Sequence, residues 1–362
     1  MRFLEVISGW INRHFSNEEA IYLVVLLVAV FVLLFTLGGV LAPVLIGLVF
    51  AFLLQGMVKK LVDFKVPEKV AVYGAFIVFV SATIGLVLFL VPLVWRQSRA
   101  LIVGLPGGII QVQAVLRDLS VSTPGSFFTP DQVDQWLGAL TTEAANFSGT
   151  LLNTLLTQVP SVVALLLYMV IVPFSVFFFL KDRNQLIEWF LSLLPSERPL
   201  LTEVGDEMNV QLANYVRGKF IEILIVGLTT FVTFTLFGLN YAALLAVLVG
   251  LSVLIPFIGA AVVTIPVALV AIVQFGWTLP LTGVLGAYLV IQFLDGNFLV
   301  PLLFSSALNL HPITIVSAVL AFGGLWGIWG VLFAIPLATL VKAIYNAWPK
   351  QEDPGGDVVE AR

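Results

Sequence analysis

Two carboxylates lie in the part of the chain where charge has been almost eliminated. Between Phe220 and Val341 there is no lysine or arginine, and the only acids are Glu222 and Asp295. A soluble segment would carry many more, because roughly a quarter of the residues in soluble domains are charged. An ionisable side chain within such an apolar stretch usually faces a partner or a pathway. The chemistry that these two acids could support is the binding of a cation, a proton or a polar solute.

Asp295 is the stronger candidate of the two. It follows an apolar run in IQFLDGNFLVP, where Gly296 and Pro301 loosen the helix. An aspartate near the middle of a bilayer costs roughly 2.5–3.5 kcal/mol unless it is paired, solvated or protonated. We therefore expect a cation or proton site, or an acceptor for a polyhydroxylated substrate, with Gln292 and Asn297 as companions. The alternative is an interfacial helix cap, at which Gly296 and Asn297 turn the chain.

Glu222 lies three residues after Lys219 and five after Arg217. This spacing on a helix favours an i,i+3 ion pair between Lys219 and Glu222 at the membrane interface, where the lysine can snorkel. The alternative is a coupling carboxylate that faces the helix bundle. Arg217 and Lys219 could also hold an anionic group or a lipid headgroup.

His311 precedes Pro312 at the start of the last apolar stretch. As a group that titrates near neutral pH, it would suit a proton-coupled carrier. A lone histidine at an interface is more often structural, and this alternative stays open. A metal site is not expected, because His14 is the other histidine of the chain and neither has a cluster of ligand residues around it.

No motif in the chain indicates catalysis. The patterns Gly-x-Ser-x-Gly, His-Glu-x-x-His and Gly-Lys-Ser/Thr do not occur, and there is no cysteine. The sequence therefore predicts a protein that is not an enzyme, needs no cofactor and is not driven by ATP within this chain.

The composition indicates an all-α, polytopic integral membrane protein. The chain is 60% hydrophobic and 10% charged, with a mean hydropathy of +1.09. No soluble single domain tolerates so much apolar surface, so membrane lipid is an expected partner. No block of basic residues suggests nucleic acid as a partner.

Apolar runs predict about eight spans followed by a C-terminal helical hairpin. The uncharged run before residue 58 is interrupted by Gly38-Gly39, so we expect two spans joined by a tight turn. The C-terminal run, broken by FGGLWGIWG, either crosses twice or re-enters. The predicted parts are an N-terminal amphipathic segment with spans 1–3 (1–95), a small helical extracytoplasmic domain (96–150), span 4 (151–180), a cytoplasmic helical segment (181–219), a transport core with broken helices (220–348) and a disordered tail (349–362).

Basic residues predict the orientation of the chain. Of 17 lysines and arginines, three fall in the segments expected outside, namely Arg96, Arg99 and Arg117. Since lysine and arginine accumulate in cytoplasmic loops, we expect both termini in the cytoplasm.

Prolines and glycines mark the expected helix breaks. The segments FIGAAVVTIPVALVAI and IWGVLFAIPLATLVKAI place Ile-Pro pairs 70 residues apart, at Pro266 and Pro336. This echo arises either by chance or from a structural repeat whose broken helices surround a binding site near the midplane. The same residues could instead allow close helix packing. The full set of candidates for breaking or gating is Pro256, Gly259, Pro266, Gly296, Pro301, Pro312, Gly324, Gly327, Gly330 and Pro336.

Five segments occur in an order typical of a known family. They are VPFSVFFFLKDR, NYVRGKFIEILIVG, GLSVLIPFIGAAVVTIP, DGNFLVPLLFSSALNLHPITIV and FGGLWGIWGVLFAIPLATLVKAI. Together they resemble the autoinducer-2 exporter family of bacterial membrane proteins, most closely its PerM-like permease branch. The resemblance implies a permease of the bacterial inner membrane and a homo-oligomer, with a pentamer suggested by relatives. Members are assigned different cargo, from autoinducer-2 to sodium or lithium exchanged for protons.

Three functions are consistent with these features. The first is a secondary transporter that moves a small polar solute, such as an autoinducer-2-like molecule, by alternating access. The second is a monovalent cation/proton antiporter of the same family. The third is a membrane scaffold or regulator that acts through residues 96–150 or 181–219. Transport is favoured because the polar outliers lie in the apolar half and not in these polar segments.

Overall fold

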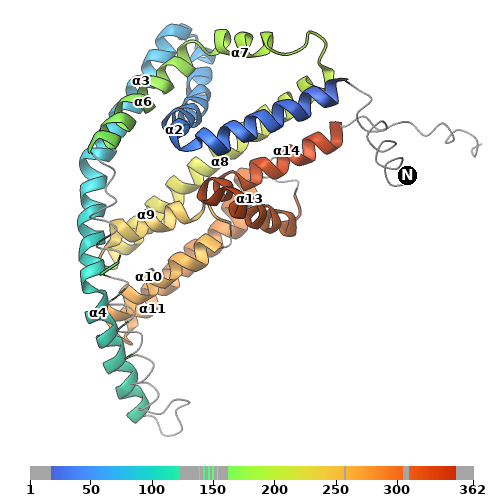
Figure 1. Ribbon diagram of the computed structural model, residues 1–362. Helices are drawn as coiled ribbons and strands as arrows, with labels where there is room; N and C mark the ends of the chain where they lie inside the picture. Colours follow the sequence, from blue (N-terminus) through green and yellow to red (C-terminus); the bar gives the residue numbers. More distant parts are fainter. Residues whose placement is uncertain are drawn as a thin grey trace, which may run out of the picture.

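The computed structural model describes residues 18–122, 162–256, 258–304 and 310–347, with isolated positions between 138 and 153. The described residues form helices and turns, and none of them forms a strand. The expected N-terminal amphipathic segment before residue 18 and the expected tail 349–362 lie outside the described residues. Figure 1 shows an open arrangement of long helices, with the last helices of the chain gathered beside α8.

Six helical segments are long and apolar enough to cross a membrane, so the all-helical, membrane-spanning prediction is confirmed. They are Ile21–Asp63, Glu68–Gly104, Ala164–Lys181, Pro199–Leu236, Ile258–Phe275 and Leu279–Phe304. Three shorter apolar helices cover Ala242–Ser252, Pro312–Gly327 and Ala334–Ala347. The described residues thus contain fewer full-length spans than the eight expected, because the first two merge and the segment near 241–257 forms only a short helix.

The turn expected at Gly38-Gly39 does not form. Helix α2 runs without interruption through Glu18–Asp63, over 46 residues. A glycine inside a helix costs only about 1 kcal/mol, whereas backbone groups freed in an apolar environment cost several. Figure 1 shows instead that α2 changes direction along its length, and Pro43 inside the helix is a typical cause of such a bend.

One long rod follows α2, made of α3 (Glu68–Gly85), η1 (Leu86–Leu90) and α4 (Val91–Ser122). η1 is a π-helical turn, and a second one, η2 (Asp295–Leu299), separates α11 (Leu279–Leu294) from α12 (Val300–Phe304). Both turns lead into the same pentapeptide, FLVPL, at 89–93 and 298–302. Proline cannot donate to the preceding turn and its ring crowds the carbonyl four residues back, so the backbone widens into a π turn.

The segment 96–122 continues this rod. Ile102 is buried, Gly108 approaches Val273 of α10, and the Leu244 N–H of α9 donates to Gln97 Oε1 at 2.8 Å. α4 therefore packs on the C-terminal half of the protein. Most of 123–161 lies outside the described residues, so the extracytoplasmic domain stays a prediction.

The C-terminal half contains the largest apolar core. It is built by α8 (Pro199–Leu236), α9 (Ala242–Ser252), α10 (Ile258–Phe275) and α11, with Leu245, Val267 and Val284 fully buried between them. Helix α14 (Ala334–Ala347) packs along α8, and α13 (Pro312–Leu332) packs against α14. Two further helices, α6 (Val162–Lys181) and α7 (Arg183–Ser192), connect the N-terminal half to α8. α6 packs along α2 through a second core that includes Val58, Ala75 and Val176.

Candidate functional site: a buried charged cluster on α8

Helix α8 carries an ion pair into the apolar core. Lys219 Nζ lies 2.8 Å from Glu222 Oε2, and the two residues are only 8% and 1% exposed. They share one buried face of α8 with Tyr215, Val226 and Thr230, at spacings of three and four residues. The ion pair that the spacing predicts is present, but it is buried in protein and not snorkelling at an interface.

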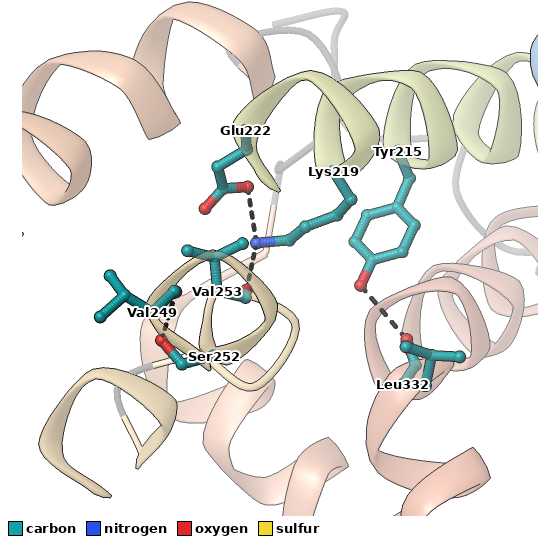
Figure 2. Close-up of polar contacts among 7 residues, drawn as sticks. All are labelled: Tyr215, Lys219, Glu222, Val249, Ser252, Val253 and Leu332. Atoms are coloured by element: carbon teal, nitrogen blue, oxygen red, sulfur yellow. Dashed lines mark hydrogen bonds and ion pairs between the residues drawn. The ribbon is translucent and has the colours of Figure 1, made fainter. Parts of the chain in front are cut away.

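Lys219 also satisfies a carbonyl at the break between α9 and α10. Its Nζ donates to Val253 O at 2.8 Å, as Figure 2 shows. The carbonyls of Leu251 and Ser252 accept from backbone N–H groups three residues further on. The next donor in that pattern would be Pro256, which has no N–H. Val253 O is therefore open to a side chain, and a lysine suits the negative end of a helix.

Tyr215 does the same one turn earlier on α8. Its hydroxyl donates to Leu332 O at 3.2 Å, at the end of α13 (Figure 2). The residue four positions after Leu332 is Pro336, which again lacks the N–H that would continue the helix. One face of α8 thus supplies a hydrogen-bond donor to each of two proline-associated breaks.

Asp295 completes the cluster from another helix. It stands at the junction of α11 and η2, and α8 packs against both elements. Its charge interacts with that of Lys219, and Glu222 interacts with both. Asp295 Oδ1 is buried and has no hydrogen-bond partner among the described residues. Of the two acids singled out in the sequence, Glu222 thus contacts Lys219 directly and Asp295 lies within range of its charge, with Oδ1 available for a ligand.

A phenyl ring closes one side of this cluster. Lys219 Nζ lies 5.1 Å from the centre of the Phe304 ring, and Phe304 is 1% exposed. Gly218 makes room for this ring, since a Cβ there would lie 2.6 Å from Phe304 Cε1. An ammonium over an aromatic face is stabilised electrostatically.

The two amides expected beside Asp295 are engaged elsewhere. Gln292 Nε2 donates to Tyr288 OH at 2.8 Å, and that hydroxyl lies 2.8 Å from Thr264 Oγ1 on α10. Asn297 is exposed, and its Nδ2 donates to Phe293 O at 2.9 Å. Gln292 thus belongs to a polar link between α10 and α11, and neither amide is hydrogen-bonded to Asp295.

His311 has a local role in the structure. It caps α13, where its Nδ1 accepts from the Ile313 N–H at 3.3 Å, and it is exposed. Pro312 occupies the first turn of the same helix, where the missing N–H is not needed. Neither residue is among the contacts of the charged cluster.

The two echo segments contain matching close approaches. A Cβ on Gly259 would collide with the Ser252 carbonyl, and one on Gly330 would collide with the Phe322 carbonyl. Each glycine thus follows a break in the helix. Because it has no side chain, the helical segment after the break can pack closely against the end of the segment before the break. In α13 the break is at Gly327, whose φ of 60° and ψ of −138° are not helical.

The remaining helix breakers behave differently from one another. Gly296 and Gly324 have no neighbour that a side chain would meet. Pro266 lies inside α10, and Pro301 follows η2. The close backbone approach seen at Gly259 and Gly330 is therefore not shared by every glycine and proline in the predicted set.

The contribution of Lys219 and Tyr215 to the breaks was not predicted from the sequence, where Lys219 was considered as the partner of Glu222 and, with Arg217, as a possible holder of an anionic group or a lipid headgroup. A signal was present in the spacing of Tyr215, Lys219, Glu222 and Val226, which share a helical face. Within the described residues, no group of three or more His, Cys, Asp or Glu side chains could hold a metal ion.

Several helices of spanning length around a buried charged cluster define a polytopic helical membrane protein. The chain belongs to the AI-2E family transporter family, whose sequence profile matches residues 20–350. It is 44% identical over 353 residues to the candidate permease PerM of Escherichia coli (strain K12), covering 96% of this chain and 98% of PerM.

Two more distant relatives match this chain over most of their length. The chain is 28% identical over 318 residues to the candidate transport protein YueF of Bacillus subtilis (strain 168), covering 84% of this chain and 82% of YueF. A candidate transport protein of Methanothermobacter thermautotrophicus is 26% identical over 317 residues, covering 87% and 90%. The class of function is therefore membrane transport, as the resemblance in the sequence predicts.

Proposed function

We propose that this protein is a secondary transporter that moves a small polar solute across the bacterial inner membrane by alternating access. The observation that supports this most is the buried Lys219–Glu222 pair, with the half-buried Asp295 within range of its charges, in the apolar half of a membrane transport protein. Charged groups inside membrane proteins are costly and usually serve a pathway. The cluster offers one ammonium and two carboxylates, which suit the hydroxyl groups of an autoinducer-2-like molecule.

In this proposal, the segments that move during transport are the helix breaks. The α9–α10 break receives a side-chain hydrogen bond from Lys219, and the end of α13 receives one from Tyr215. In the conformation described here Lys219 is engaged with Val253 O and Glu222. A change in the α9–α10 break would release Val253 O, so that Lys219 could turn to Asp295 or to the solute.

We propose cytoplasmic termini and a homo-oligomeric assembly, following the distribution of basic residues and the family resemblance.

Exchange of a monovalent cation for protons is the second candidate. The observation that favours it is Asp295 Oδ1, which is buried without a hydrogen-bond partner in the described part of the chain. Two acids share one lysine, so the cluster carries an excess negative charge whenever both are ionised. A monovalent cation or a proton would neutralise that excess.

Flux measurements on the purified full-length protein in liposomes separate the candidates. A polar-solute transporter is expected to move a hydroxylated furanosyl solute without a requirement for sodium or lithium. An antiporter is expected to acidify or alkalinise the lumen when a sodium or lithium gradient is applied. The absence of both fluxes from vesicles with correctly inserted protein would contradict transport and would support the scaffold.

A further inference from the structure

A second polar site lies on the opposite side of α8 from the buried cluster. It is a groove of about 1080 Å³ that is lined by α2, α6, α7 and α8, together with Glu68 at the start of α3. Figure 1 shows that α7 extends from the end of α6. Arg217, two residues from Lys219, lines this groove, whereas Lys219 turns toward α9.

The groove carries an excess of positive charge. Its lining includes Lys59, Arg183 and Arg217 from three different helices, and Glu68 is the only acid in that lining. None of the three cations forms an ion pair with another described residue. Arg183 donates to Asn184 Oδ1 at 3.3 Å, which leaves most of its donors available. Three cations that line the groove with a single acid leave a net positive charge, which suits an anionic ligand.

The position of Arg217 is built into the fold. A Cβ on Gly56 of α2 would lie 3.1 Å from Arg217 Nε, so the absence of a side chain there lets the guanidinium lie close against α2. The neighbouring lining residues Gln55 and Asn214 add polar groups at the same level of the groove. A guanidinium presents planar, paired donors that match a phosphate.

The rest of the groove is apolar, and α7 forms one wall. No residue of α7 is buried, and its exposed side chains include Ile187 (41%), Trp189 (64%) and Phe190 (44%). The opposite wall includes Phe52 and Phe179 on α2 and α6. An amphipathic helix that follows a span directly, with a tryptophan on it, is typical of the membrane interface.

We propose that this groove binds a phospholipid with an anionic headgroup. The phosphate lies among Lys59, Arg183 and Arg217, and an acyl chain lies along the aromatic wall between α2 and α7. This assignment follows from charge complementarity at one end and apolar lining at the other, near the start of the apolar half of α8. It does not depend on the proposed transport function.

The test is lipid binding by the full-length protein in neutral detergent, followed by native mass spectrometry with dioleoyl phosphatidylglycerol and dioleoyl phosphatidylcholine. We expect preferential binding of phosphatidylglycerol.

Lys59→Gln and Arg217→Gln are each expected to weaken that binding about fivefold, since a basic residue near an anionic lipid surface contributes about 1 kcal/mol. Lys60→Gln is the matched control, because Lys60 is the exposed neighbour of Lys59 on α2 and does not line the groove. Glu68→Gln is expected to strengthen binding, which a misfolded variant could not do.

Four results would overturn the proposal. Equal binding of the two lipids would remove the headgroup preference, and equal loss in Lys60→Gln and Lys59→Gln would remove the site. Competition by glycerol 3-phosphate as effective as that by phosphatidylglycerol would identify a water-soluble anion as the ligand. A changed oligomeric state in Arg217→Gln with unchanged lipid binding would show that a second copy of the chain covers the groove.

Discussion

Lys219 makes contacts of three kinds in the apolar core. It pairs with Glu222, donates to Val253 O and lies over the Phe304 ring. Burying an ion pair is seldom a net gain in stability, but removing one partner leaves an uncompensated charge that is expensive. Because an apolar trio could fill the same space at no such cost, we propose that these three ionisable groups serve a function.

Single substitutions in the pair are therefore expected to cost more than the double substitution. Lys219→Met strands Glu222 and Val253 O, and we expect it to lower the free energy of unfolding by about 3–5 kcal/mol. Lys219→Met combined with Glu222→Leu is expected to recover most of that loss, because no buried charge of the pair remains. Thermal unfolding of the unmodified protein, Lys219→Met, Glu222→Leu and the double variant in detergent gives the double-mutant cycle. Additive losses would show that the two side chains do not act as a pair.

The sequence predicted part of this cluster for a definite reason. The pairing of Lys219 with Glu222 is local, set by the pitch of one helix, and needs no tertiary information. The approach of Asp295 depends on α8 packing against α11 and η2, and the bond to Val253 depends on where Pro256 ends α9. Gln292 and Asn297 were expected beside Asp295 because they are near in sequence, yet a π turn and a tyrosine on the same helix direct them elsewhere.

At the scale of helices, prolines mark several of the points at which the chain departs from regular geometry. Pro92 and Pro301 each follow a π turn, Pro256 leaves the end of α9 open, and Pro336 leaves the end of α13 open. In each of the last two cases α8 supplies the missing donor. The two breaks are therefore coupled to the same helix, which is an arrangement suited to coordinated movement.

The glycines that close the two hairpins are expected to be far less tolerant than other helical glycines. Gly259→Ala and Gly330→Ala place a methyl group against a backbone carbonyl, and we expect each to destabilise the protein by about 1–3 kcal/mol and to reduce flux. Gly286→Ala and Gly324→Ala are the matched controls, since no neighbouring atom meets a side chain at either position. Melting temperatures of the four variants check this. Equal melting temperatures for the hairpin and control variants would show that the backbone does not approach closely there.

At the scale of the molecule, the sequence predicted the class more reliably than the count of spans. Apolar composition alone requires membrane helices, whereas the boundaries depend on whether glycines interrupt them. Gly38-Gly39 does not interrupt α2, and the segment near 241–257 forms a helix of 11 residues, too short to span alone. The extracytoplasmic domain and the re-entrant form of the C-terminal hairpin stay predictions, because membrane position is not fixed by the helices themselves.

The whole molecule thus has two polar regions on α8, a closed one around Lys219 and an open one around Arg217. The closed region lies among broken helices and suits a transported solute or cation. The open region lies between α2 and α7 and suits a lipid. The two proposals concern different side chains of the same helix. Variants in one region are therefore expected to leave the other region intact.

The measurement that tests the central proposal most directly is flux through Asp295→Asn in liposomes. It is compared with Asp206→Asn, which makes the same chemical change at an exposed position in the polar half of α8. At equal amounts of inserted protein, we expect Asp295→Asn to reduce flux at least tenfold, equivalent to about 1.4 kcal/mol in the barrier. Asp206→Asn is expected to transport like the unmodified protein. Wild-type flux in Asp295→Asn, and also in Glu222→Gln, would contradict the assignment of this cluster to transport.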